Sequence, residues 1–126
     1  MDQALRIRKV LGGGMRQAGY LAAAGIYALD HNIDRLEEDH QKAVELGAQL
    51  EKIPFVKQVE PIETNIVIFQ LEEEKCTSEK FLEVLTKKEI HIIGMGQGKL
   101  RMVTHMDYTA EMHEHTLKIL QSLTDL

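Results

Sequence analysis

The chain has 126 residues, of which 44% are hydrophobic, and a net charge of −5. This length suits a single small domain with an apolar core, and the acidic balance disfavours a general nucleic-acid binder. No run of 18 apolar residues predicts a membrane-spanning helix. Because Cys76 is the only cysteine, we expect neither an internal disulfide nor a thiolate metal cluster. A chain with so few cysteines is also expected in the cytoplasm.

The first 17 residues differ in charge from the rest of the chain. They carry four basic groups and one acidic group, for a net charge of +3, whereas residues 18–126 sum to −8. Two interpretations are open: a solvated helix face, or attraction for a small anion or an acidic partner surface. Residues 2–10 alternate apolar and charged positions and predict a short helix. The pattern starts abruptly, so we expect the chain to be part of a longer protein.

Three consecutive glycines, Gly12 to Gly14, follow this helix, and Arg16 comes two residues later. A second helix is predicted over residues 15–32. Its first N–H groups would point back toward the glycines, and a helix N-terminus beside an arginine suits an anion such as a phosphate. A flexible hinge between two helices is the alternative, because glycine has the greatest backbone freedom.

The helix expected over residues 15–32 is apolar on nearly all sides between Tyr20 and Leu29. Such a helix is either deeply buried or part of an interface. One interpretation is that another domain or subunit covers it, which its small residues would allow. The other is that it forms the central core helix of this domain.

The remaining pattern predicts alternating helices and strands. Asn32 is a candidate cap for a helix over residues 33–53, whose inner face carries Ala43, Leu46 and Leu50, and Pro54 ends it. A final helix over residues 111–126 would place Met112, His115, Ile119 and Leu123 on one side. Between them the sequence predicts strands at 55–60 and 65–71, a capped helix at 78–89, a strand at 90–93, a turn at 94–98 and a strand at 99–104.

This order predicts an α+β fold: a small, mostly antiparallel sheet of three or four strands packed by helices and preceded by long helices. We place a soft domain boundary near Asn32. Residues 1–32 would form N-terminal helices with the Gly-rich loop, and residues 33–126 would form the small α+β domain.

Few residues form patterns that indicate chemistry. The six histidines are scattered, and the sequence contains no HExxH motif, no GxSxG motif and no Cys/His cluster, so no metal site is predicted. The glycines between Gly94 and Gly98 lie between two predicted strands. They are therefore expected to form a hairpin turn and not a phosphate-binding loop.

Arg101 lies inside an otherwise apolar strand, with Leu100 and Met102 predicted on the opposite face. A partly buried guanidinium in such a place needs an anionic partner. It could form a structural ion pair, with Asp107 as the candidate. It could equally form a bidentate contact with the carboxylate of a ligand.

Residues 8–19, residues 21–25 and residues 100–107 resemble the threonine aldolases. Asp39-His40 and residues 64–67 also lie where that family has similar pairs, so the resemblance covers nearly the whole chain. It implies a pyridoxal-phosphate (PLP) enzyme of the aspartate-aminotransferase fold. Such enzymes cleave threonine or allo-threonine to glycine and acetaldehyde, in the cytoplasm and as homotetramers or other homo-oligomers.

The resemblance implies roles for three residues. Arg16 would reach the cofactor phosphate from a neighbouring subunit, Lys9 would lie near the same active site, and Arg101 would bind the substrate α-carboxylate. Only the C-terminal part of the family matches, and no lysine here matches the family's Schiff-base lysine. The chain alone is therefore predicted to be inactive. A non-catalytic oligomerisation or interaction module, or part of a related PLP-dependent β-eliminating lyase, are the alternatives.

Overall fold

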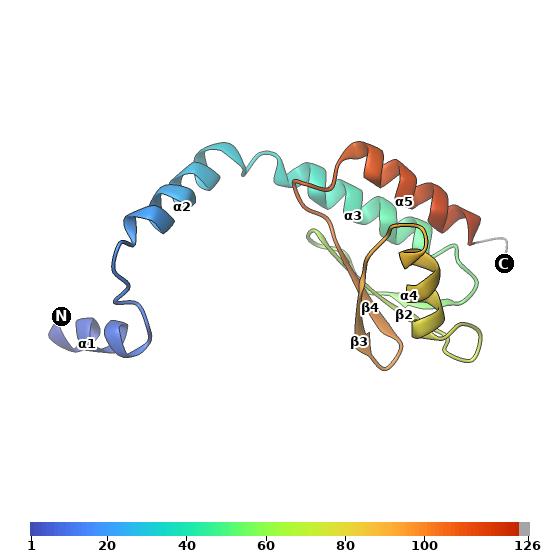
Figure 1. Ribbon diagram of the computed structural model, residues 1–126, viewed down its shortest axis with the longest axis horizontal. Helices are drawn as coiled ribbons and strands as arrows, with labels where there is room; N and C mark the ends of the chain where they lie inside the picture. The colour runs from blue at the N-terminus through green and yellow to red at the C-terminus, as the bar shows by residue number, and fades with distance from the viewer. Residues whose placement is uncertain (124–126) are drawn as a thin grey trace. The chain divides into compact units, whose positions relative to one another are not determined.

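The computed structural model describes residues 1–123, which form two compact units. Unit 1 comprises Met1–Asp34, and unit 2 begins at Arg35. The elements, labelled in Figure 1, are α1 (Asp2–Val10), α2 (Gly19–His31), α3 (Leu36–Leu50), β1 (Val56–Val59), β2 (Ile66–Leu71), α4 (Ser78–Thr86), β3 (Ile93–Gly96), β4 (Lys99–Val103) and α5 (Ala110–Ser122).

Unit 1 consists of α1 and α2, and neither helix has a buried residue. The bounds of α1 agree with the prediction. By contrast, α2 begins at Gly19 and not at Met15, because the backbone before it enters the left-handed region at Gln17, where φ is 53°. Asn32 ends α2 and does not cap α3, so that expectation was wrong.

Two of the three glycines form the C-terminal cap of α1. Gly12 has a φ of +83°, and its N–H donates to the Lys9 carbonyl at 3.2 Å. The N–H of Gly13 donates to the Arg8 carbonyl at 2.7 Å, which completes a Schellman motif. A side chain on Gly13 would meet Arg8 Cγ at 2.7 Å. Gly12 and Gly13 are thus required by a tight turn, and the glycines do not lie at a helix N-terminus as expected.

Unit 2 contains a four-stranded antiparallel sheet in the order β1-β2-β4-β3. The central strands β2 and β4 alternate between two faces. Val67, Phe69 and Leu71 from β2 are buried on the same face as Leu100 and Met102 from β4. The predicted α+β class and the predicted faces of β4 are confirmed.

Helices α3, α4 and α5 all pack on this one face of the sheet (Figure 1). The ring of Phe81 in α4 meets the ring of Phe69 edge-on at a centroid distance of 5.9 Å. The Oγ1 atoms of Thr77 and Thr109 accept backbone N–H bonds at 3.3 Å and so cap α4 and α5. The opposite face of the sheet is not covered by these helices, and we call it the open face.

Two predictions for unit 2 were wrong. Strand β3 lies at Ile93–Gly96, later in the sequence than expected. Gly94 pairs with Leu100 of β4, so the turn is confined to the residues after Gly96. The inner row of α5 is His113, Thr116, Leu120 and Leu123. Of the predicted row, Leu123 is buried and Ile119 packs against the core, whereas Met112 and His115 are exposed. The burial of His113 is possible because its Nε2 lies 2.7 Å from Glu45 Oε2. Residues 124–126 of the predicted last helix lie outside the described residues.

Candidate functional site

Arg101 occupies the middle of β4, and its side chain lies on the open face because its neighbours Leu100 and Met102 are buried on the other. The Nε atom of Arg101 is buried and makes no hydrogen bond to any residue in the described range 1–123. Asp107, the candidate partner from the sequence, has its carboxylate 3.8 Å from His105 Nδ1 instead. The guanidinium of Arg101 is therefore available for an anion from outside this part of the chain.

Arg101 lies between two isoleucines on the neighbouring strands. Ile68 of β2 and Ile93 of β3 are its direct cross-strand partners. In an antiparallel pair of strands, opposite residues alternate between hydrogen-bonded and non-hydrogen-bonded pairs. Because the Thr104 N–H donates to the Asn65 carbonyl opposite it, Ile68–Arg101 is a non-hydrogen-bonded pair. In such pairs the Cα atoms are about 4.5 Å apart and the side chains are close. The arginine stem is thus flanked by branched apolar side chains, which agrees with the burial of Nε.

A second cation lies on the same face of β4, two residues before Arg101. The Nζ atom of Lys99 is 3.1 Å from Glu60 Oε1. Glu60 follows β1, and its N–H donates to the Ile68 carbonyl at 2.8 Å. Glu60, Ile68, Arg101 and Ile93 therefore lie along one row that crosses the whole sheet. The carboxylate in this row is paired with Lys99.

The end of β4 is fixed by buried hydrogen bonds. Thr104 is fully buried, and its Oγ1 donates to the Asp39 carbonyl at 2.6 Å. Asn65 Nδ2 donates to the Thr104 carbonyl at 2.7 Å. The Asp39 carboxylate accepts two bonds from the Arg35 guanidinium, at 2.9 and 3.0 Å. These bonds join α3, β2 and β4 three residues beyond Arg101.

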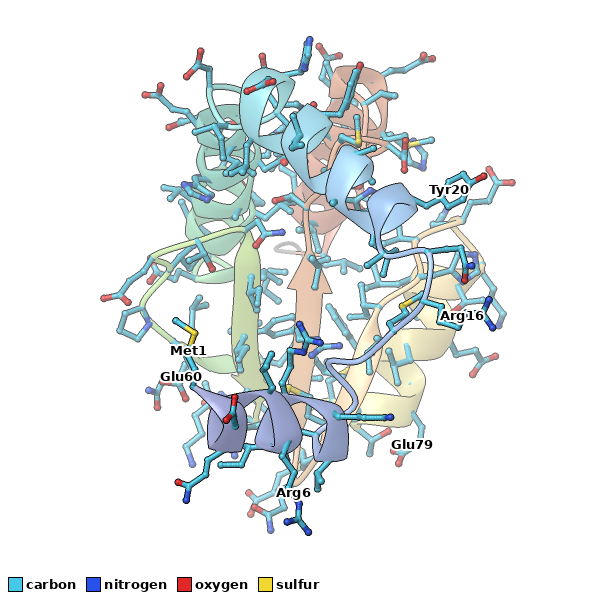
Figure 2. All side chains as sticks on the ribbon, turned by 90° about the vertical axis from the view of Figure 1, so that its left-hand side faces the viewer. Met1, Arg6, Arg16, Tyr20, Glu60 and Glu79 are labelled. Atoms are coloured by element: carbon cyan, nitrogen blue, oxygen red, sulfur yellow. The ribbon has the colours of Figure 1, made fainter. Side chains whose placement is uncertain are left out.

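Lys9 and Arg16 belong to unit 1, and both are exposed. Within the described residues neither side chain has a hydrogen bond or an ion pair. Lys9 Cγ lies 3.3 Å from where a side chain on Gly14 would begin, so Lys9 packs beside the glycine turn. Figure 2 shows Arg16 on the segment that joins α1 to α2, with Tyr20 at the start of α2. Two unpaired cations of this kind suit a phosphate group.

No signal in the sequence predicts two of the polar contacts in unit 2. Glu60 and Lys99 are 39 positions apart, and Glu45 and His113 are 68 apart, so only the folded register brings each pair together. Over residues 1–123, the structure has no set of three His, Cys, Asp or Glu side chains placed to hold a metal ion. The same residues include no helix with the length and apolarity needed to cross a membrane.

Solved structures of aminotransferases share the fold of this chain. The ornithine aminotransferase of Toxoplasma gondii matches 82% of this chain and 25% of its own, with a TM-score of 0.63 and 15% identity. The histidinol-phosphate aminotransferase of Clostridium acetobutylicum matches 71% of this chain and 26% of its own, with a TM-score of 0.53 and 23% identity. At these identities the likeness concerns the fold.

Sequence comparison then defines the family. A family model described as beta-eliminating lyase matches residues 1–74, so the chain belongs to the beta-eliminating lyase family. Low-specificity L-threonine aldolase 1 of Arabidopsis thaliana is 34% identical over 96% of this chain and 34% of its own length. The low-specificity L-threonine aldolase of Escherichia coli K12 is 38% identical over 88% of this chain and 32% of its own. The resemblance to threonine aldolases is confirmed, and the chain spans about a third of the length of these relatives.

Proposed function

We propose that this chain is part of a PLP-dependent threonine aldolase, which cleaves threonine or allo-threonine to glycine and acetaldehyde. The observation that carries the proposal is Arg101, an arginine on the open face of the sheet with a buried Nε and no partner among residues 1–123. The similarity to low-specificity threonine aldolases along 88% or more of the chain supports the choice of reaction.

In this proposal Arg101 binds the α-carboxylate of the amino-acid substrate. A guanidinium can donate two parallel N–H bonds to a carboxylate, which fixes orientation as well as position. The substrate would then be held with its Cα–Cβ bond perpendicular to the cofactor ring, the arrangement that cleavage needs. The rigid β2–β4 pair would keep the guanidinium in place during turnover.

Lys9 and Arg16 are the proposed contacts to the cofactor phosphate, and Arg16 would reach it in a neighbouring subunit of a homo-oligomer. Their exposure and lack of partners in the described chain support this role. When bound, the cofactor supplies the electron sink for carbon–carbon cleavage. In the proposed assembly, residues 1–32 lead to the part that carries the Schiff-base lysine, and residues 33–126 form the small domain. Residues 1–126 alone would then show no turnover, and the proposed compartment is the cytoplasm.

The proposal is tested by grafting residues 1–126 in place of the matched third of the Escherichia coli relative. The graft should release acetaldehyde from threonine. Arg101→Lys in the graft should raise KM for threonine about 10- to 100-fold, because a charged hydrogen bond is lost and lysine cannot reproduce the two-pronged contact. A graft that folds and shows the visible absorption of bound PLP, yet cleaves no threonine, would contradict the aldolase assignment.

A second candidate function has its own supporting observation. Helix α2 is apolar on nearly all sides and has no buried residue, so the chain could act as a non-catalytic oligomerisation or interaction module. Sedimentation of the 126-residue chain tests this, and a clean monomer would argue against it. A panel of amino acids assayed with the graft separates an aldolase from a β-eliminating lyase.

A further inference from the structure

A residue that binds a ligand carboxylate must not be occupied by a carboxylate of its own chain. Glu60 lies in the same row of the sheet as Arg101, with only Ile68 between them. Successive Cα atoms along such a row are about 5.5 Å and 4.5 Å apart, so Glu60 and Arg101 are separated by about 10 Å at the backbone. Two long side chains on this face can bridge such a distance, because Lys99 of β4 already contacts Glu60, the residue that follows β1.

Lys99 holds the Glu60 carboxylate at 3.1 Å, and Arg101 has no ion pair among the described residues. We infer that Lys99 is a positioning residue: by pairing with Glu60 it keeps that carboxylate away from Arg101 and leaves the guanidinium free for the substrate. The inference rests on the proposed function, because it gives the free guanidinium its purpose. In the absence of Lys99, Glu60 would turn toward the nearest remaining cation in its row, which is Arg101.

A simpler role for Lys99 makes a different prediction. If Lys99 only adds positive charge to the open face, Lys99→Met and Glu60→Gln would each change the electrostatic field at Arg101 by a fixed amount, so their effects on the Arg101 signals would add. If Lys99 restrains Glu60, the effect of Glu60→Gln depends on whether Lys99 is present. The four chains of a double-mutant cycle, with and without each substitution, separate the two cases.

The first measurement uses no ligand. The guanidinium N–H signals of Arg101 are recorded by ¹⁵N NMR in the wild-type chain, K99M, E60Q and K99M/E60Q. We expect K99M to shift these signals and to slow their hydrogen exchange, because Glu60 now accepts from Arg101. Adding E60Q should return them to the wild-type values. No shift in K99M, or a shift that persists in the double variant, would overturn the inference.

The second measurement titrates the same four chains with sodium acetate at constant ionic strength, following the Arg101 signals. K99M should weaken acetate binding about twofold to fivefold, the range that an exposed ion pair supports. The double variant should recover the wild-type affinity, whereas E60Q alone should change it little. An equal effect of E60Q in both backgrounds would contradict the inference. If acetate moves the Arg101 signals in no variant, the carboxylate-binding role of Arg101 fails, and the ligand-free measurement still decides the role of Lys99.

Lys87→Met is the matched control. Lys87 forms an exposed ion pair with Glu83 at 2.6 Å, and both residues lie on or next to α4, on the covered face of the sheet. This substitution removes the same charge and the same kind of pair without touching the open face. It should leave the Arg101 signals and acetate binding unchanged. A response to K87M as large as that to K99M would show a general charge effect and overturn the inference.

Discussion

The helices of unit 1 and of unit 2 both carry large apolar side chains, but only those of unit 2 are buried. Leu50 and Leu85 of unit 2 are fully buried, whereas Leu21 and Leu29 of unit 1 are 61% and 68% exposed. Apolar burial is the main favourable term in folding, so unit 2 has the means to be stable by itself. The apolar surface of unit 1 is typical of a segment that another protein surface covers. The comparison separates a unit with a buried core from one whose large apolar side chains are exposed.

The same substitution in each unit gives the largest expected contrast. Leu50→Ala should lower the free energy of unfolding by about 2–5 kcal/mol, because it leaves a cavity in a packed core. Leu21→Ala removes an identical group from an exposed position and should change it by less than about 0.5 kcal/mol. Urea unfolding of the 126-residue chain, followed by circular dichroism, measures both. Equal losses would show that α2 is packed in solution, and the contrast between the units would fail.

Removal of residues 1–32 should have a smaller effect on stability. The truncated chain keeps the Arg35–Asp39 ion pair and the complete core, so its free energy of unfolding should stay within about 1 kcal/mol of the full chain. Self-association, measured by sedimentation, should fall at the same time because the exposed α2 is gone. A truncated chain that no longer unfolds cooperatively would show that unit 2 needs unit 1.

The smallest effect concerns the contact between α3 and α5. Hydrogen bonds from Gln41 and then His113 hold the pKa of Glu45 below its ordinary value of 4.5. Since the folded pKa is the lower one, Glu45 contributes stability above pH 4.5, and this contribution is lost as the pH falls through the folded pKa.

Glu45→Gln should therefore flatten the loss of stability between pH 5 and pH 3. The change should be below about 1 kcal/mol, because the Glu45 side chain is 43% exposed and screened by solvent. Urea unfolding at several pH values measures it, and the chain without residues 1–32 should show the same flattening. An unchanged pH profile in the variant would mean that the two hydrogen bonds do not persist in solution.

Local signals in the sequence were sufficient for much of unit 2. The continuous apolar run of β2, the Thr77 cap of α4 and the alternation around Arg101 all led to correct elements, because each reports a short-range preference. The errors arose where contacts between residues far apart in the sequence determine the local structure. Gly94 and Gly96 indicate a turn by their own preference, yet pairing with β4 draws them into a strand. His113 was not among the residues expected on the inner side of the last helix, and its burial depends on the contact with Glu45, 68 positions away.

In the candidate site, too, local patterns predicted some features and contacts between distant parts of the sequence determine others. The open-face position of Arg101 followed from alternation alone, and its assignment to a carboxylate remains a prediction, as do the roles of Lys9 and Arg16. The pairing of Lys99 with Glu60 could not be predicted, because it depends on how β1 and β4 align with the β2 strand between them. The bond pattern that ends α1 was missed because the three glycines were assigned to the wrong helix terminus.

The two edge strands share an irregularity that the central strands lack. The register shifts in β1 between Val56 and Gln58, and in β3 between Gly94 and Gly96, whereas β2 and β4 pair without interruption. A sheet edge with free N–H and C=O groups is a template for adding strands from other molecules, and a bulge twists it away from such pairing. All four residues of β3 are exposed, and none is charged. Edges with such register shifts are poorer templates for strand-by-strand association between copies of this chain.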